Sequence, residues 1–287
     1  MGDTSRGLYG KFFVERTDGK SAPGQHALGV RWGAGQPRRR TSASNWAKPL
    51  AWNKRAQQSG ERRLVFCSSL ADVFDNEVPA DWRADLFRLI LATPHLTWLL
   101  LTKRIGNVAT MLHADQWEHL GNVWLGITVV NQEESDRDIP KLLSVPAAKR
   151  FVSYEPALGP VDWRFAFADG RTACCHVCGF RTNQVGGMCP NDGARLRGDI
   201  GIDWIIVGGE SDQPGMKARP FDIEWARSTV RQCKAAGVAC FVKQLGSNPA
   251  PLIVEAGSVR ERLWLKDRAG ADPAEWPEDL RVQEWPQ

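Results

Sequence analysis

Polar and charged side chains follow six short apolar stretches of this sequence, and together they suit a polar or anionic ligand. Glu155, Glu210 and Lys243 are the candidates for catalysis, because carboxylates beside cations hold their charge through one another. The candidates for contact with a substrate or cofactor are Ser68, Asp72, Lys103, Arg104, Thr128, Asn131, Gly208, Gly209, Ser211 and Gln244. Any one of them could simply mark where a buried strand meets water, but the whole set favours a shared pocket.

These residues do not belong to a motif that names a reaction. The sequence has no phosphate-loop motif, no GxSxG and no HExxH. No named reaction therefore follows from these side chains.

A second group of potential ligands lies between Cys174 and Cys189, where four of the seven cysteines fall. Cys175-His176-Val177-Cys178-Gly179 is a CxxC knuckle with a glycine that permits a tight turn, and Cys189-Pro190-Asn191-Asp192-Gly193 repeats its shape. Two such knuckles hold one tetrahedral ion in zinc ribbons. We expect structural zinc on Cys175, Cys178, Cys189 and Asp192, with His176 or Cys174 as alternative fourth ligands. An iron–sulfur cluster and free or redox thiols are the alternatives to zinc.

The remaining cysteines and the overall composition indicate a soluble protein of the cytoplasm. Cys67, Cys233 and Cys240 lie in apolar segments and are expected to pack in the core. The cysteine pattern does not resemble an extracellular disulfide framework. No segment approaches the roughly 20 apolar residues of a membrane span, and residues 1–6 do not form a signal peptide.

Six apolar stretches, beginning near residues 64, 98, 123, 150, 203 and 239, are predicted to be the strands that position the polar residues. In the most informative one, the apolar run 204–207 continues directly into Gly208, Gly209 and Glu210. A short apolar run ended by glycine indicates a strand buried on both faces, as in a parallel sheet. Helical patterns alternate with the strands at 45–58, from Asp81 to Pro94, and at 107–113, 132–144 and 223–236.

The strand spacing predicts the fold class. Spacings of 25 to 36 residues suit βα units, whereas the 53-residue gap before the fifth strand holds the cysteines. We predict an α/β fold, a partial (β/α) TIM-like barrel, with a zinc-ribbon-like insertion at 171–198. A doubly wound sheet is the alternative, but it gathers its ligand groups at one switch point. Residues 1–45 would be a loop-rich lead-in, 46–249 the barrel and 250–287 a tail.

The charge of the chain does not require a nucleic-acid partner. The net charge is only +4, and the one local basic cluster is Arg38-Arg39-Arg40. A run of three arginines is more often a solvated loop than a binding patch.

Several segments resemble, in order and spacing, the phage gene-product thirty-seven/sixty-eight family. They are VFCSSLADVFD (65–75), WLLLTKR (98–104), NVWLGITVVNQEESDRDIP (122–140), RFVSYEPALGPVDW (150–163), IDWIIVGGES (202–211), ARPFD (218–222) and FVKQLG (241–246). The resemblance covers about Trp32 to Gly246, and WPEDLRVQEWP (276–286) is similar to endings in that family. It adds Arg219 to the candidate binding residues.

That family is similar to radical S-adenosylmethionine enzymes, which implies a partial barrel whose first strand loop carries three cysteines on a [4Fe–4S] cluster. Here the first cysteine is Cys67, inside a predicted strand, and nothing before it resembles that motif. Either the sequence begins downstream of its true start or it is a degenerate member. S-adenosylmethionine and the cluster are expected only if a longer chain supplies the cysteines, and radical chemistry is not expected as given.

Two functions remain in competition. The leading expectation is a phage or prophage protein related to these enzymes, with a polar pocket at the strand ends that acts on nucleic acid or a nucleotide. The alternative is a non-catalytic module that uses the zinc ribbon and Arg38–Arg40 to hold nucleic acid or a partner protein.

Overall fold

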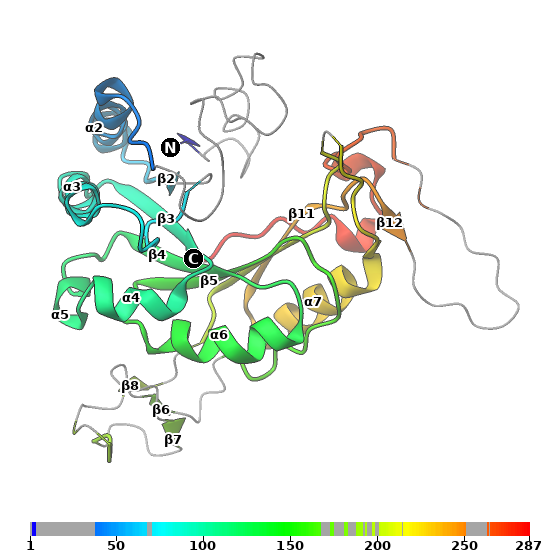
Figure 1. Ribbon diagram of the computed structural model, residues 1–287. Coiled ribbons are helices and arrows are strands. Elements are labelled where there is room, and N and C mark those ends of the chain that lie inside the picture. Colours follow the sequence, from blue (N-terminus) through cyan, green and yellow to red (C-terminus); the bar gives the residue numbers. More distant parts are fainter. Residues whose placement is uncertain are drawn as a thin grey trace, which may run out of the picture. The chain divides into compact units, whose positions relative to one another are not determined.

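The protein is seen here as a computed structural model divided into two compact units, Met1–Leu125 and Gly126–Gln287. The described residues are 2–3, 38–67, 71–167, 173–174, 181–182, 188–191, 193, 197–198, 201–213, 215–250, 263 and 265–287. Both units contain helices and strands paired in parallel (Figure 1). The predicted α/β class is therefore confirmed.

The first unit is built around two parallel strands. In chain order its elements are β1 (Gly2–Asp3), α2 (Ala43–Ser59), β2 (Arg63–Cys67), α3 (Ala80–Leu91), β3 (Leu96–Thr102), α4 (Ile105–Met111) and α5 (Ala114–Trp117). β2 pairs in parallel with β3, from Arg63 opposite Leu96 to Cys67 opposite Leu100. β1 pairs antiparallel with β2, and α2 contacts both β2 and β3. The boundary between the units falls within β4 (Val123–Thr128).

The sequence explains most of these elements. Six of the seven residues of β3 are buried, as its continuous apolar run predicts. The start predicted at Asp81 is one residue late, because α3 begins at Ala80 after Pro79. Asp81 lies in the first turn instead, where the helix dipole also favours a carboxylate. Leu86 and Ile90 are buried on one face of α3, as their spacing predicts.

The second unit carries three parallel strands in the order β5, β9, β11. Its elements are α6 (Gln132–Ser144), β5 (Lys149–Tyr154), β6 (Ala173–Cys174), β7 (Arg181–Thr182), β8 (Arg197–Gly198), β9 (Trp204–Gly208), β10 (Phe221–Asp222), α7 (Ile223–Ala236), β11 (Ala239–Gln244), β12 (Pro249–Ala250), and the 3-10 turns η1 (Pro273–Glu275) and η2 (Glu278–Leu280). β9 lies between β5 and β11, and all five of its residues are buried. The reading of 204–207 as a strand buried on both faces is confirmed.

The two long helices of the second unit have the predicted bounds because their caps are local. The Asp222 side chain accepts a hydrogen bond from Glu224 N and begins α7, and Gly237, with φ of 67°, ends it. Asn131 accepts from Glu134 N in the same way and begins α6. Pro140 lies inside α6 without ending it. α7 then packs on β9 and β11 (Figure 1).

The described residues of the C-terminal stretch cover β11. Val242 N donates to Val282 O at 2.8 Å, and Glu284 N donates to Cys240 O at 2.9 Å. The rings of Trp204 and Trp285 lie 4.8 Å apart between centroids. The part of 265–287 that follows η2 is thus paired with the sheet as an added strand-like segment.

The cysteine-rich segment is described only in part. Its backbone forms a small antiparallel sheet in the order β7, β6, β8. Cys175, Cys178 and Asp192 lie outside the described residues, as does His176, so the predicted zinc site stays a prediction. Cys67, Cys233 and Cys240 are each 1% exposed, which confirms their predicted burial in the core.

Candidate functional site

The carboxyl edge of β5, β9 and β11 brings together most of the residues predicted to act. The last residue of β5 lies opposite Val207 of β9, and Gly208 lies opposite Gln244 of β11. Because the strands run parallel, the residues that follow β5 and β9 share one edge with the end of β11. This edge holds the three predicted catalytic residues, Glu155, Glu210 and Lys243.

Glu155 and Lys243 form an ion pair at this edge. Lys243 Nζ lies 3.3 Å from Glu155 Oε2, and Ser153 Oγ donates to the same oxygen at 3.1 Å. Only 12% of the Glu155 side chain and 20% of the Lys243 side chain are exposed. Within the described part of the chain, Glu155 Oε1 is buried and accepts no hydrogen bond. A buried polar atom without a partner costs about 1–3 kcal/mol, so its presence calls for a reason.

Gly208 and Gly209 are required by close approach. A Cβ on Gly208 would lie 2.9 Å from Glu155 Oε1 and 3.2 Å from Gln244 O. A Cβ on Gly209 would lie 2.5 Å from Leu245 O, closer than side chains pack against backbone. The glycine pair therefore lets the end of β9 fit between the Glu155 carboxylate and the chain after β11.

Gln244 links this strand edge to the loop after β9. Its Nε2 donates to Gly209 O at 2.8 Å and to Ser211 Oγ at 2.9 Å. Because Ser211 Oγ accepts this bond, its own hydroxyl proton can be donated elsewhere. Two of the predicted binding residues are thus adjacent in space.

Glu210 is held by Arg219. Arg219 Nε lies 2.9 Å from Glu210 Oε2 and Nη2 lies 3.0 Å from Oε1, and the backbone N of Arg219 adds a bond of 3.1 Å to Oε2. The Arg219 guanidinium, despite the opposing effect of burial, lowers the pKa of Glu210. Both oxygens of Glu210 are occupied. Its placement suits a role in fixing the loop between β9 and β10, and its predicted catalytic role stays a prediction.

The strand ends of the first unit carry a different cluster. Asp72 accepts hydrogen bonds from Thr102 Oγ1 at 2.8 and 2.9 Å, from Phe74 N at 2.9 Å and from Lys103 N at 3.0 Å. These bonds tie the loop after β2 to the end of β3. Arg104 reaches Asp72 with a longer ion pair of 3.6 Å. Lys103 is exposed, and Ser68 lies outside the described residues.

Asp75 completes this cluster and was missed by the sequence reasoning. Arg38 Nη2 lies 2.7 Å from Asp75 Oδ2, and Arg104 Nη2 lies 3.6 Å from the same oxygen. Burial by itself raises the pKa of Asp75, but the Glu77 N–H and the two guanidinium groups outweigh it and hold the pKa below its usual value. The signal in the sequence is its position three residues after Asp72 in the same loop. Ser153 was also missed, although it lies two residues before Glu155 at the end of β5.

Thr128 and Asn131, the remaining predicted binding residues, are placed differently. Thr128 ends β4 and is buried, with 6% of the residue exposed. Asn131 Oδ1 accepts a hydrogen bond from Glu134 N at 3.0 Å, so this oxygen already serves as the cap of α6. A binding role for either residue stays a prediction.

One of the two cysteine knuckles is visible in part. Cys189 is buried, and Gly193 N donates to Cys189 O at 2.9 Å. Gly193 has φ of 69°, in the left-handed region that a glycine adopts without strain. This hydrogen bond and this φ are those that the turn expected between Cys189 and Gly193 requires. Among the described residues no group of three or more potential ligands could hold a metal ion.

Comparison with known proteins identifies the family. Residues 5–268 match the model of a family described as protein of unknown function (DUF5131). The match covers most of the chain, so the chain belongs to this family. No curated protein and no solved structure matches it. In the described part of the chain, no helix is long and apolar enough to span a membrane.

Proposed function

We propose that this chain binds a nucleotide and acts on it at the carboxyl edge of β5, β9 and β11. The observation that carries the proposal is the Glu155 carboxylate, in which Oε2 is paired with Lys243 and Oε1 is buried without a donor from the described residues. A ligand that supplies a hydrogen-bond donor would remove the cost of that unpaired oxygen. A site that gains a partner only when ligand binds discriminates strongly against molecules without the donor.

The pair of side chains fits the edge of a nucleobase. Glu155 offers an acceptor, and Lys243 offers a donor whose Nζ lies 3.3 Å from Glu155 Oε2. Cytosine, adenine and guanine present an amino or ring N–H donor next to an acceptor on one edge. Glu155 would accept from the donor and Lys243 would donate to the acceptor, which fixes the base in one orientation.

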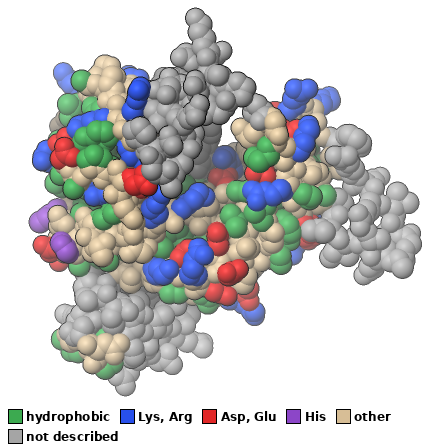
Figure 2. Space-filling model, viewed as in Figure 1, with side chains coloured by type: hydrophobic (Ala, Val, Ile, Leu, Met, Phe, Trp, Pro, Cys, Tyr) green, Lys and Arg blue, Asp and Glu red, His purple; other side chains and the backbone are tan. Residues whose placement is uncertain are grey.

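The surface charge favours a single nucleotide over a long nucleic acid. On the face drawn in Figure 2, the basic and acidic side chains of the described residues are interspersed. A duplex is held mainly by cations that follow its phosphates, and the net charge of the chain is only +4.

Binding of nucleosides tests the proposal. Isothermal titration calorimetry would compare the common ribo- and deoxyribonucleosides on the wild type, Glu155→Gln and Lys243→Met. The matched control is Glu224→Gln, which breaks the ion pair of Glu224 with Arg227 on α7. We expect at least one nucleoside to bind, and both strand-edge variants to weaken it about tenfold or more. Equal binding by Glu155→Gln and the control would refute the proposal.

The relationship of this chain to the phage family and to radical S-adenosylmethionine enzymes, suggested by the sequence motifs, is also a proposal. We infer a partial (β/α) barrel of phage or prophage type related to radical S-adenosylmethionine enzymes, supported by the parallel strands and their charged carboxyl edge. A cluster with one open iron requires three thiolates. Cys67, Cys233 and Cys240 are buried in regular elements, and they do not fit that requirement. No step of the proposed function therefore depends on a cluster.

A second function rests on the cysteine segment. The β7, β6, β8 sheet and the Cys189–Gly193 turn favour a small zinc-binding module that contacts nucleic acid or a partner protein. Metal analysis of purified protein should find about one zinc per chain, and Cys175→Ser with Cys178→Ser should abolish it. Iron with sulfide instead of zinc would contradict this function, and Cys67→Ser serves as the control.

A further inference from the structure

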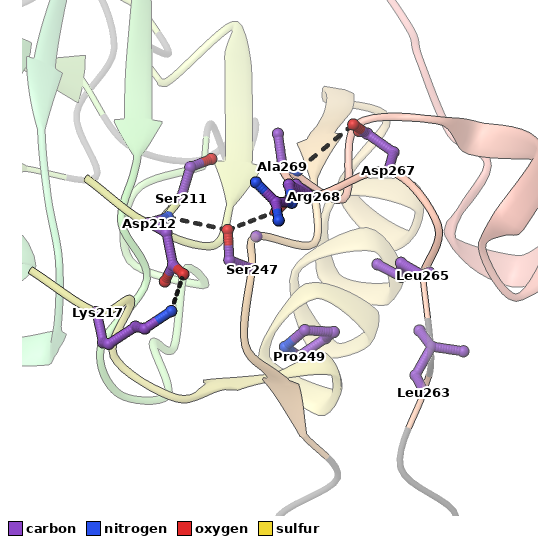
Figure 3. Close-up of a pocket in the computed structure, with 11 residues that line it drawn as sticks. Ser211, Asp212, Lys217, Ser247, Pro249, Leu263, Leu265, Asp267, Arg268 and Ala269 are labelled. Carbon is purple, nitrogen blue, oxygen red and sulfur yellow. Dashed lines mark hydrogen bonds and ion pairs between the residues drawn. The ribbon is translucent and has the colours of Figure 1, made fainter. Parts of the chain in front are cut away.

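A pocket of about 510 Å³ lies next to the strand edge in the second unit (Figure 3). Its polar lining comes from the loops that follow β9 and β11 and from the stretch before η1. The polar side chains are Ser211, Asp212, Lys217, Ser247, Asp267 and Arg268. Pro249, Leu263 and Leu265 form an apolar wall. A volume of this size with one apolar wall suits a small organic ligand.

The carboxylates of the pocket are already satisfied. Asp212 accepts from Lys217 Nζ at 2.7 Å and from Ala218 N at 2.9 Å. Asp267 accepts from Ala269 N at 3.4 Å and from Ala271 N at 2.5 Å. Neither carboxylate oxygen of either residue therefore needs a donor from a ligand.

Two donors of the pocket have no acceptor in the described chain. Ser211 accepts from Gln244 at its Oγ, so its hydroxyl proton is not used. The Arg268 guanidinium makes no hydrogen bond or ion pair there, and it acts on Asp212 only through its charge, which contributes to lowering the pKa of Asp212. Figure 3 shows the Arg268 side chain extending toward Ser211 and Asp212. Arg268 is exposed, so its donors face solvent and are available to a ligand. Available donors beside satisfied carboxylates favour an acceptor-rich ligand group.

We propose that this pocket binds the phosphate of the nucleotide, with Arg268 and Ser211 as its donors and Lys217 as a nearby cation. This inference rests on the proposed function and names the group at the other end of the same ligand. Gln244 connects the two places, because it bonds Ser211 while its Cγ and backbone flank Gly208 beside Glu155. A tetrahedral phosphate has acceptors for donors that arrive from different directions.

The charges of the pocket set the expected strength of this contact. Lys217 and Arg268 are balanced by Asp212 and Asp267, so the pocket carries no formal excess of positive charge. Free phosphate is expected to bind weakly, and a nucleoside 5′-monophosphate more tightly, because its base is held at Glu155 at the same time.

Calorimetry with three probes tests the phosphate contact: inorganic phosphate, a nucleoside, and the corresponding 5′-monophosphate. Arg268→Met and Ser211→Ala should weaken the monophosphate about tenfold and about threefold, and leave the nucleoside unchanged. Lys266→Met is the matched control. It also removes one positive charge and lies two residues before Arg268, but Lys266 does not line the pocket. Circular dichroism and thermal melting confirm that the variants are folded.

The outcomes separate the two proposals. If Arg268→Met weakens the monophosphate while Glu155→Gln leaves the nucleoside unchanged, the phosphate contact stands and the proposed function is wrong. If Arg268→Met behaves as Lys266→Met does, the phosphate contact is refuted whatever Glu155→Gln does. Failure of both phosphate and every monophosphate to bind the wild type at millimolar concentration also refutes it.

Discussion

Each of the two units has a carboxylate at its strand ends, and the two carboxylates differ in how many of their oxygens accept hydrogen bonds. In the first unit, Asp72 receives hydrogen bonds at both oxygens from a side-chain hydroxyl and two backbone N–H groups. In the second unit, one oxygen of Glu155 accepts a hydrogen bond from Ser153 and pairs with Lys243. The other oxygen accepts no hydrogen bond from the described residues. The saturated carboxylate fixes a loop, whereas the unsaturated one keeps an acceptor for the ligand of the proposed function. Position at a strand end is therefore not enough to identify a site.

The largest expected loss of stability comes from removing the saturated carboxylate, Asp72. Asp72→Ala should lower the free energy of unfolding by about 3 kcal/mol, because Thr102 and the N–H groups of Phe74 and Lys103 lose their acceptor. Urea denaturation measures this change. Asp115→Ala, on the exposed surface of α5, should change stability by less than about 0.5 kcal/mol. A loss no larger than that of the control would remove the distinction between the two carboxylates.

A smaller loss of stability is expected when the glycines at the end of β9, beside Glu155, are replaced by alanine. In Gly208→Ala the new Cβ would lie 2.9 Å from the end of the Glu155 side chain and 3.2 Å from Gln244 O, so we expect a loss of about 1 kcal/mol and displacement of Glu155. In Gly209→Ala the Cβ meets the backbone oxygen of Leu245, and the loss should exceed that of Gly208→Ala. Thermal melting of both variants checks this order, and the reverse order would contradict the described packing.

The ion pair between Glu210 and Arg219 contributes to the free energy of unfolding in a way that depends on pH. The lowered pKa of Glu210 means that the contribution is fully present above the ordinary pKa of 4.5 and is lost as pH falls through the lowered pKa. Glu210→Gln should cost about 0.5–1 kcal/mol at pH 7, since Arg219 is half exposed and water screens the pair.

Urea denaturation at several pH values measures that difference. The wild type and Glu210→Gln should converge in stability toward acid pH. A constant difference at every pH would show that the Glu210 charge is not the cause.

Glu155, whose substitution should weaken binding about tenfold, is expected to contribute little to stability. Glu155→Gln should leave the free energy of unfolding within about 1 kcal/mol of the wild type, because it removes a desolvated charge as well as an ion pair. Urea denaturation beside the nucleoside titration shows the two effects separately. A stability loss comparable to that of Asp72→Ala would make Glu155 a structural residue like Asp72.

The sequence predicts the elements well and the side-chain partners poorly. α6 and α7 have the expected bounds because their start signals are local, Asn131 and Asp222. The convergence of Glu155 and Lys243 also follows from strand order alone, since both lie at the carboxyl ends of parallel strands. Whether a carboxylate is satisfied depends on donors far away in sequence, such as Thr102 for Asp72. No periodicity or spacing of the chain contains that information.

The pairing of the C-terminal stretch with β11 has a practical consequence for handling the protein. In the order β5, β9, β11, the last strand would present unpaired N–H and C=O groups, and Val282 and Glu284 occupy them. An uncovered strand edge is a template for pairing with other molecules. Removing residues 281–287, or anchoring the protein to a surface through them, would therefore promote self-association. An affinity tag or fluorophore joined at this end should follow a linker that leaves Trp285 against Trp204.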